Sequence, residues 1–192
     1  MLVKQIYFLR HSIRDTTVHH EQAPLTLEGQ QLAKEISDFF IDKGITQIYS
    51  SPFQRTIDTV KPTAQKLALE IQTIDLFRER SVGEWIADFD SFASKQWHDF
   101  DYKLTGGESL NDVANRMLPA FKKLLKNSDE SILICGHGTA LSVLFHFLTD
   151  GKFDYTDFLK MKMPDAYRLN FSDEKLVTFE NITFQNKKQT VK

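Results

Sequence analysis

Strand-like and helix-like stretches alternate along most of this chain. Short apolar runs are followed by longer segments in which apolar residues recur at helical spacing. The strand candidates are residues 4–9, 45–50, 71–74 and 131–138, and the helix candidates are residues 25–44, 51–70, 106–125 and 139–148. This alternation is typical of a parallel sheet covered by helices. We predict an α/β fold, a three-layer α/β/α sandwich with a mostly parallel central sheet.

Local signals predict where several of these elements begin and end. Thr26 is placed to cap the first helix, and Ser109, with an acidic residue three positions on, is placed to cap the third. Pro62 is expected to kink or break the second helix because proline lacks the N–H donor. Residues 166–184 are predicted to form a hairpin, and residues 185–192 are expected to fray.

The bulk composition narrows the class of protein. A chain of 192 residues with 41% hydrophobic residues suits one domain over residues 1–192. A net charge of −2, from 24 basic and 26 acidic residues, disfavours a nucleic-acid partner. No apolar run is long enough for a membrane span, and the N-terminus does not resemble a signal peptide. We therefore expect a cytoplasmic protein. Its one cysteine, Cys135, is predicted to be buried and inert.

One segment interrupts the alternation. Residues 85–104 are dense in aromatic side chains and lie between the third strand and the glycine pair of the third helix. We interpret the segment as a helical lid insertion folded over the sheet edge near the active site. The alternative is an ordinary packing role for the rings, since aromatic stripes usually belong to a core.

Two histidines stand where strands of the predicted sheet end. His11 follows the first strand, and His137 closes the fourth. Gly138 comes next and begins a helix whose first N–H groups are able to receive an anion. In parallel sheets, ligands gather beyond the carboxyl ends of the strands. We therefore expect both histidines and Gly138 at one ligand site.

Three arginines are predicted to reach the same place. Arg10 and Arg14 flank the first histidine, and Arg55 lies on the first turn after the second strand. Planar guanidinium groups match the oxygens of phosphate, so the cluster predicts a phosphate site. Nearby guanidinium charges also favour a neutral, nucleophilic histidine.

Taken in order, the stretches FLRHSIR, LTLEG, SSPFQRT, LFRERSVGEW, GGES and ILICGHG resemble the histidine phosphatase superfamily, which has the phosphoglycerate mutase-like fold. The resemblance runs from about residue 3 to residue 148. It implies that His11 is the nucleophile that becomes phosphohistidine and that Arg10 and Arg55 bind phosphate. It also implies that His137 is the second histidine, which binds the transferred phosphoryl group.

The resemblance extends to the proton donor and to a third arginine. Glu79 matches the proton donor by its spacing before GEW, and Glu84 is the competing candidate. Arg14 corresponds to the extra arginine of the acid-phosphatase branch. Ser12 departs from that branch's motif, which has glycine at this position.

These inferences predict a metal-independent phosphomonoesterase that acts on a small phosphorylated metabolite through a phosphohistidine. Arginine charge would do the work that Mg²⁺ does in kinases, so no metal or other cofactor is expected. Two alternatives stay open: a phosphoglycerate-type phosphomutase, and a non-catalytic module that binds a phosphorylated ligand.

The other four histidines are interpreted without a catalytic role. His19 and His20 lie in a polar loop near the expected pocket mouth, and too few further ligands accompany them for a metal site. His98 and His146 have aromatic or apolar neighbours and are expected to be packing residues.

Overall fold

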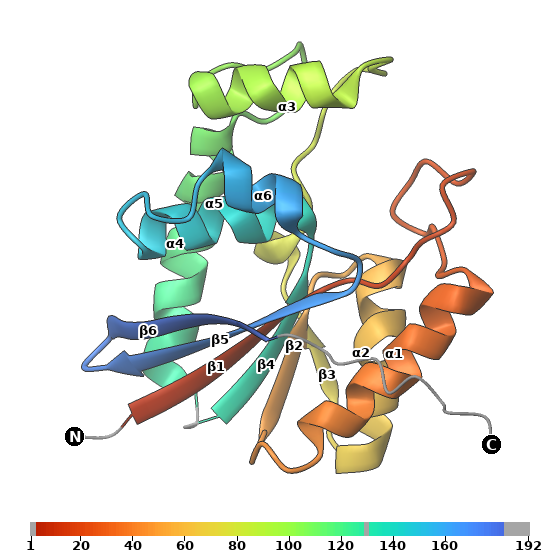
Figure 1. Ribbon diagram of the computed structural model, residues 1–192, viewed down its shortest axis with the longest axis vertical. Helices are drawn as coiled ribbons and strands as arrows, with labels where there is room; N and C mark the ends of the chain where they lie inside the picture. The colour runs from red at the N-terminus through yellow and green to blue at the C-terminus, as the bar shows by residue number, and fades with distance from the viewer. Residues whose placement is uncertain (1–2, 129–130, 183–192) are drawn as a thin grey trace, which may run out of the picture.

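A six-stranded sheet forms the centre of the computed structural model, which describes residues 3–128 and 131–182 (Figure 1). The strand order is β3-β2-β4-β1-β5-β6. The strands are β1 (Val3–Arg10), β2 (Gln47–Ser50), β3 (Ile71–Thr73), β4 (Ser131–Gly136), β5 (Asp165–Ser172) and β6 (Lys175–Ile182). The pairs β1–β4, β2–β4 and β2–β3 are parallel, whereas β5 runs antiparallel to both β1 and β6. The predicted α/β fold with a mostly parallel sheet is therefore confirmed.

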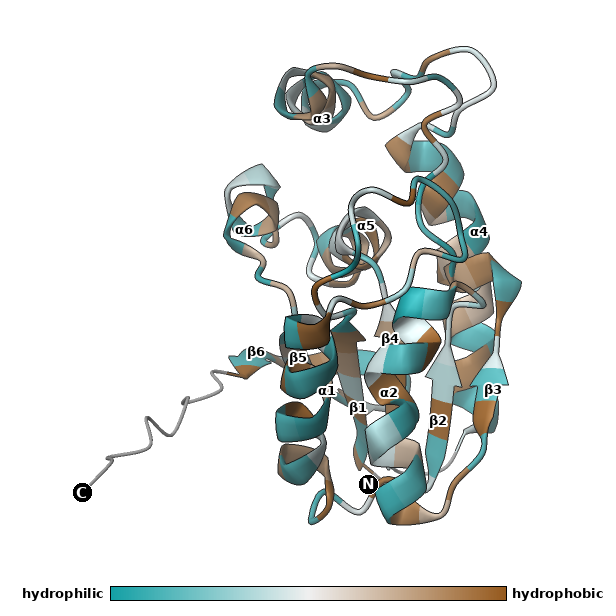
Figure 2. Ribbon diagram, turned by 90° about the vertical axis from the view of Figure 1, so that its right-hand side faces the viewer, coloured by the Kyte–Doolittle hydropathy of each residue, from teal (hydrophilic) through white to brown (hydrophobic). Residues whose placement is uncertain are grey.

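Helices cover both faces of this sheet (Figures 1 and 2). The helices are α1 (Leu27–Phe40), α2 (Gln54–Leu67), α3 (Phe89–His98), α4 (Leu110–Asn127), α5 (Gly138–Leu148) and α6 (Tyr155–Lys160), with a short 3₁₀ turn at Asp75–Phe77. Helices α1 and α2 lie on one face, and α4 and α5 lie on the other. Within the described residues, no helix is long and apolar enough to cross a membrane.

The side chains of β1 show why it is the central strand. Tyr7 and Leu9 point into the core beneath α1 and α2, and Ile6 and Phe8 point into the core beneath α4 and α5. All four side chains are fully or almost fully buried. A strand buried on both faces lacks a polar side, which explains the continuous apolar run in the sequence.

The predicted helix signals are largely confirmed, with one exception. Thr26 and Ser109 cap α1 and α4, each accepting a backbone N–H bond from the first turn. Helix α2, however, continues through Pro62 without a break. A proline removes only one N–H donor, and buried Val60 and Ala64 hold the turns around it against the sheet.

The C-terminal hairpin is also confirmed, as β5 and β6. Asp173 and Glu174 form its turn with φ angles of 48° and 62°, the left-handed conformation that suits a tight hairpin. The fraying expected at residues 185–192 lies outside the described residues.

Candidate active site

Parallel pairing of β1 with β4 brings the two predicted histidines together. The backbone N–H of His11 donates to the carbonyl oxygen of Gly136 at 3.0 Å, which continues the pairing beyond the end of β1. The next residue after Gly136 is His137, and the two imidazole centroids lie 5.3 Å apart. The pairing of β1 with β4 therefore places the two predicted histidines side by side where the strands end.

The His11 ring is held as a neutral imidazole. It is 5% exposed, and its Nδ1 lies 2.8 Å from the carbonyl oxygen of Ser12. A carbonyl oxygen can only accept, so Nδ1 carries the proton and Nε2 keeps its lone pair. The pKa of His11 is lowered to about 3, chiefly by burial and also by the charges of Arg55, Arg10 and Arg14, whereas the Ser12 contact opposes the shift.

Ser12 binds the loop after β1 to helices α1 and α2 through two hydrogen bonds. Its hydroxyl donates to the carbonyl oxygen of Gly29 in α1 at 2.8 Å, and its N–H donates to the hydroxyl of Thr59 in α2 at 2.9 Å. A side chain at Gly29 would bring a Cβ within 2.1 Å of the carbonyl oxygen of Ile13. Ser12 is thus bound at a point where α1 approaches the loop closely.

Arg10 lies against the start of α5. Its Nη1 donates to the carbonyl oxygen of Met161 at 2.8 Å. A Cβ at Gly138 would lie 2.9 Å from the guanidinium carbon of Arg10, so only glycine leaves room for this contact. The Nε of Arg10 is buried and has no hydrogen-bond partner within the described residues.

Arg55 lies on α2, and Arg14 lies in the loop that follows β1. Arg55 is 8% exposed, stacks 4.8 Å from the ring centroid of Phe53, and has a buried Nε with no partner in the described part of the chain. Arg14 is half-buried, and its Nη1 donates to the carbonyl oxygens of Asp15 and Val18 at 3.2 and 3.1 Å. Arg14 therefore also holds the loop that carries His19 and His20, both of which are exposed.

His137 is fully buried, with a different environment at each ring nitrogen. Nε2 lies 2.8 Å from the hydroxyl oxygen of Ser51, and Nδ1 has no partner among the described residues. Burial places the pKa of His137 well below its ordinary value, and the neighbouring His11 and Arg55 lower it further.

Glu79 binds the N-terminus of α5. One carboxylate oxygen accepts N–H bonds from Ala140 at 2.9 Å and Arg80 at 2.8 Å, and the other accepts one from Thr139 at 3.1 Å. Two N–H groups at the start of α5, where a ligand anion was expected, thus bind the carboxylate of Glu79 instead. Glu84 is exposed and has no hydrogen bond within the described residues.

An ion-pair network that the sequence analysis missed supports the Glu79 loop. Arg116 of α4 donates from Nε to Glu108 at 2.7 Å and from Nη2 to the carbonyl oxygen of Glu79 at 3.3 Å. Arg78 also donates to Glu108, at 3.1 Å. Burial acts to raise the pKa of Glu108, but the hydrogen bonds and positive charges around it lower the pKa overall. This network fixes the backbone beside Glu79.

The segment 85–104 contains α3, and the rings of Trp97 and Phe100 pack against α5 and α6. The Trp97 ring lies 5.7 Å from His146 and 5.8 Å from Phe158, and the Phe100 ring lies 4.9 Å from His146. These two rings thus have a packing role, and the lid role of the segment stays a prediction. His146 is a packing residue, as expected, but His98 is exposed on α3, so that expectation is wrong.

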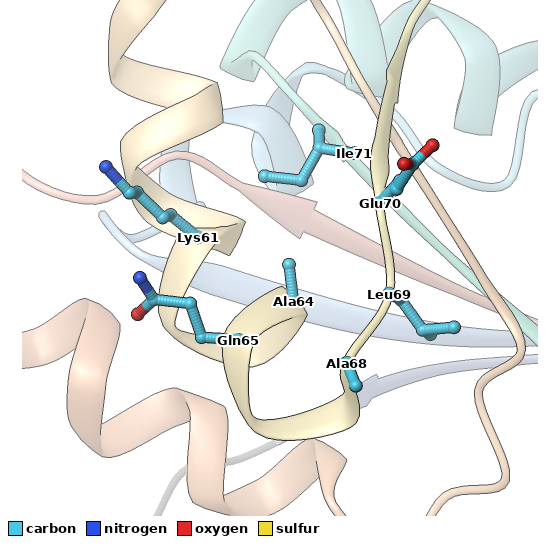
Figure 3. Close-up of a pocket in the computed structure, with 7 residues that line it drawn as sticks. All are labelled: Lys61, Ala64, Gln65, Ala68, Leu69, Glu70 and Ile71. Atoms are coloured by element: carbon cyan, nitrogen blue, oxygen red, sulfur yellow. The ribbon is translucent and has the colours of Figure 1, made fainter.

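Seven predicted residues therefore meet where the strands end: Arg10, His11, Arg14, Arg55, Glu79, His137 and Gly138. The hollow in Figure 3 is a separate feature, between the end of α2 and β3. Its lining runs over Lys61–Ile71 and includes none of the seven.

Two buried histidines among arginine side chains form a site suited to phosphate chemistry. The model of the histidine phosphatase superfamily (branch 1) matches residues 6–181, and the chain belongs to this superfamily.

Similar proteins include both mutases and phosphatases. "Probable phosphoglycerate mutase GpmB" of Proteus mirabilis (strain HI4320) is 29% identical over 156 residues, 73% of this chain and 72% of that protein. Human 6-phosphofructo-2-kinase/fructose-2,6-bisphosphatase 1 is 23% identical over 176 residues, 86% of this chain but 37% of that protein. A mycobacterial glucosyl-3-phosphoglycerate phosphatase has a TM-score of 0.75 at 18% identity, over 93% of this chain and 97% of that one.

We predict that His11 contributes to destabilisation by acid. The pKa of histidine is near 6.5 in an unfolded chain but about 3 for folded His11. Between these values the unfolded state binds more protons, so stability is lost as the pH falls. From pH 7.5 to 5.0 this costs about 2 kcal/mol in the free energy of unfolding.

Denaturant unfolding at both pH values should therefore show a smaller loss of stability for His11→Gln than for the wild type. His98→Gln, at an exposed position, is the matched control and should lose as much as the wild type. An equal loss in His11→Gln would contradict the prediction.

Proposed function

We propose that this protein is a metal-independent phosphomonoesterase that hydrolyses a small phosphorylated metabolite through a phosphohistidine at His11. The observation that carries the proposal is a group of buried nitrogens without partners in the described residues: Arg10 Nε, Arg55 Nε and His137 Nδ1. A buried donor left without a partner costs about 1–3 kcal/mol. Phosphoryl oxygens are strong acceptors, so a phosphate group beside His11 would accept hydrogen bonds from these nitrogens.

The first half-reaction transfers the phosphoryl group to the protein. The lone pair of His11 Nε2 attacks phosphorus, an N–P bond forms, and the ester P–O bond breaks with its electron pair on the alcohol oxygen. The guanidinium groups of Arg10 and Arg55 stabilise the charge on the equatorial oxygens. Glu79 gives a proton to the departing oxygen.

The second half-reaction returns the protein to its starting state. Glu79 takes a proton from water, the water oxygen bonds to phosphorus, and the N–P bond breaks so that the lone pair returns to Nε2. Thr139 alone donates to one carboxylate oxygen of Glu79, whereas the other accepts two N–H bonds. The oxygen beside Thr139 has the greater remaining capacity and is the better site for the proton.

A phosphoglycerate-type phosphomutase is the second candidate, favoured by the name of the Proteus mirabilis relative. The two reactions share the phosphohistidine and differ in the acceptor, which is water or a second hydroxyl group. Arg14 supports hydrolysis, because it matches the additional arginine of the acid-phosphatase branch. Product analysis separates the two reactions.

We predict that the purified protein hydrolyses monoesters from a broad phosphate panel in the presence of EDTA. Arg55→Ala should lower kcat/KM by about 10- to 100-fold, because a charged hydrogen bond to the phosphoryl group is lost. Arg55→Lys should not restore the full rate, because an ammonium group lacks the planar fork. Arg168→Ala, which removes an exposed ion pair with Glu180, is the control and should retain activity.

Each alternative has its own outcome in this experiment. Phosphate exchange between phosphoglycerates without release of inorganic phosphate would favour the mutase. Binding of phosphate with no turnover of any monoester would favour a non-catalytic module. Turnover that is lost in EDTA and restored by a divalent metal would contradict the proposed charge stabilisation.

We predict that Glu79, and not Glu84, is the proton donor. A general acid matters most when the departing alkoxide is strongly basic. Glu79→Gln should therefore lose far more kcat on an alkyl phosphate than on p-nitrophenyl phosphate. Glu84→Gln should lose little on either substrate, and the reverse pattern would transfer the role to Glu84.

A further inference from the structure

We propose that Ser51 is a positioning residue that sets the tautomer of His137 and leaves its Nδ1–H for the phosphoryl group. The proposal rests on the proposed function for the role of that hydrogen. It begins from one contact between two fully buried side chains: the hydroxyl oxygen of Ser51 lies 2.8 Å from Nε2 of His137. The N–H of Ser51 also donates to the carbonyl oxygen of Cys135 at 3.1 Å, which places the serine beside β4.

The tautomer matters because His137 is neutral. The pKa of its imidazole lies well below the ordinary value, chiefly because of burial and also because His11 and Arg55 lower it. A neutral imidazole has one N–H donor and one acceptor nitrogen. Nδ1 therefore either donates to a phosphoryl oxygen or presents a lone pair that repels it.

The hydrogen bonds of Ser51 favour one of these states. The N–H of Phe53 donates to the Ser51 hydroxyl oxygen at 3.3 Å, so the hydroxyl already accepts one bond and still has its own hydrogen to give. Among the described residues, the other partner of this hydroxyl is His137 Nε2. The Ser51 hydroxyl thus donates to Nε2, and the imidazole proton resides on Nδ1.

The opposite tautomer satisfies fewer groups. If Nε2 carried the proton and donated to Ser51, the buried hydroxyl hydrogen would have no acceptor among the described residues. Nδ1 would be a bare acceptor without a partner. Buried polar groups without partners are costly, so the arrangement with one unpaired donor is preferred to the one with two unpaired groups. That one donor is the Nδ1–H of His137, which can donate to a phosphoryl oxygen.

The test observes the tautomer directly. The full chain, labelled with ¹⁵N-histidine and free of substrate, is studied by long-range ¹H–¹⁵N NMR at pH 7.5, with His137 assigned by loss of its signals in His137→Gln. We expect a protonated Nδ1 in the wild type and a mixture of tautomers in Ser51→Ala. Ser51→Thr retains the hydroxyl and should restore the wild-type pattern.

Ser50 offers a matched control. It is also fully buried, but its hydroxyl donates to the carbonyl oxygen of Ser51 at 2.8 Å. Ser50→Ala should keep the wild-type tautomer and kcat/KM. Ser51→Ala should lower kcat/KM for p-nitrophenyl phosphate by about 10- to 100-fold, as expected when a hydrogen bond to a charged group is lost.

The outcomes separate this proposal from the proposed function. A wild-type His137 protonated on Nε2 would overturn the assignment of Ser51 even if the protein is an active phosphatase. This measurement uses only the wild-type protein, so it does not depend on whether a variant folds. Retention of the Nδ1 proton in folded Ser51→Ala would overturn it as well. The expected tautomers in a protein that turns over no phosphate ester would support the role of Ser51 in setting the tautomer and overturn the proposed function instead.

Discussion

The parallel pairing of β1 with β4 is the constraint on which the site depends. It sets Arg10 opposite Gly136, so the residues that follow, His11 and His137, leave the sheet side by side. Both strands are buried on two faces, and a shift of register by one residue would exchange the side chains of those faces. The packing of the whole core therefore fixes the spacing of the two imidazoles.

Burial gives these groups their chemistry and also has a cost for the fold. It keeps the His11 imidazole neutral, and it leaves nitrogens of Arg10 and Arg55 without partners in the described residues. Glu79 offsets part of this positive charge from the start of α5. A phosphate ester that binds only the folded state would return further stability by mass action. Under the proposed function, the stability lost by burying these groups would be partly recovered when a phosphorylated ligand binds.

The sequence predicted most of the fold and the group of side chains that gathers where the strands end, because strand ends and the motif residues are local features. It missed Ser51, since Ser50 and Ser51 look alike until the pairing with β4 shows which one reaches His137. It also missed the Arg116–Glu108 ion pair, because only the tertiary structure shows that α4 brings Arg116 to the backbone of Glu79. The error at His98 arose because aromatic neighbours in sequence do not fix which side of α3 a residue occupies. Such facts depend on tertiary contacts.

The most direct test of phosphoryl transfer to His11 is a rapid quench of the protein during turnover of a ³²P-labelled phosphate monoester, followed by peptide mapping. We expect an acid-labile, alkali-stable label on the peptide that contains His11, formed fast enough to account for kcat. The same experiment with His11→Gln should give no label. A label on a different residue, or turnover of the ester by His11→Gln at the wild-type rate, would contradict a phosphohistidine mechanism at this site.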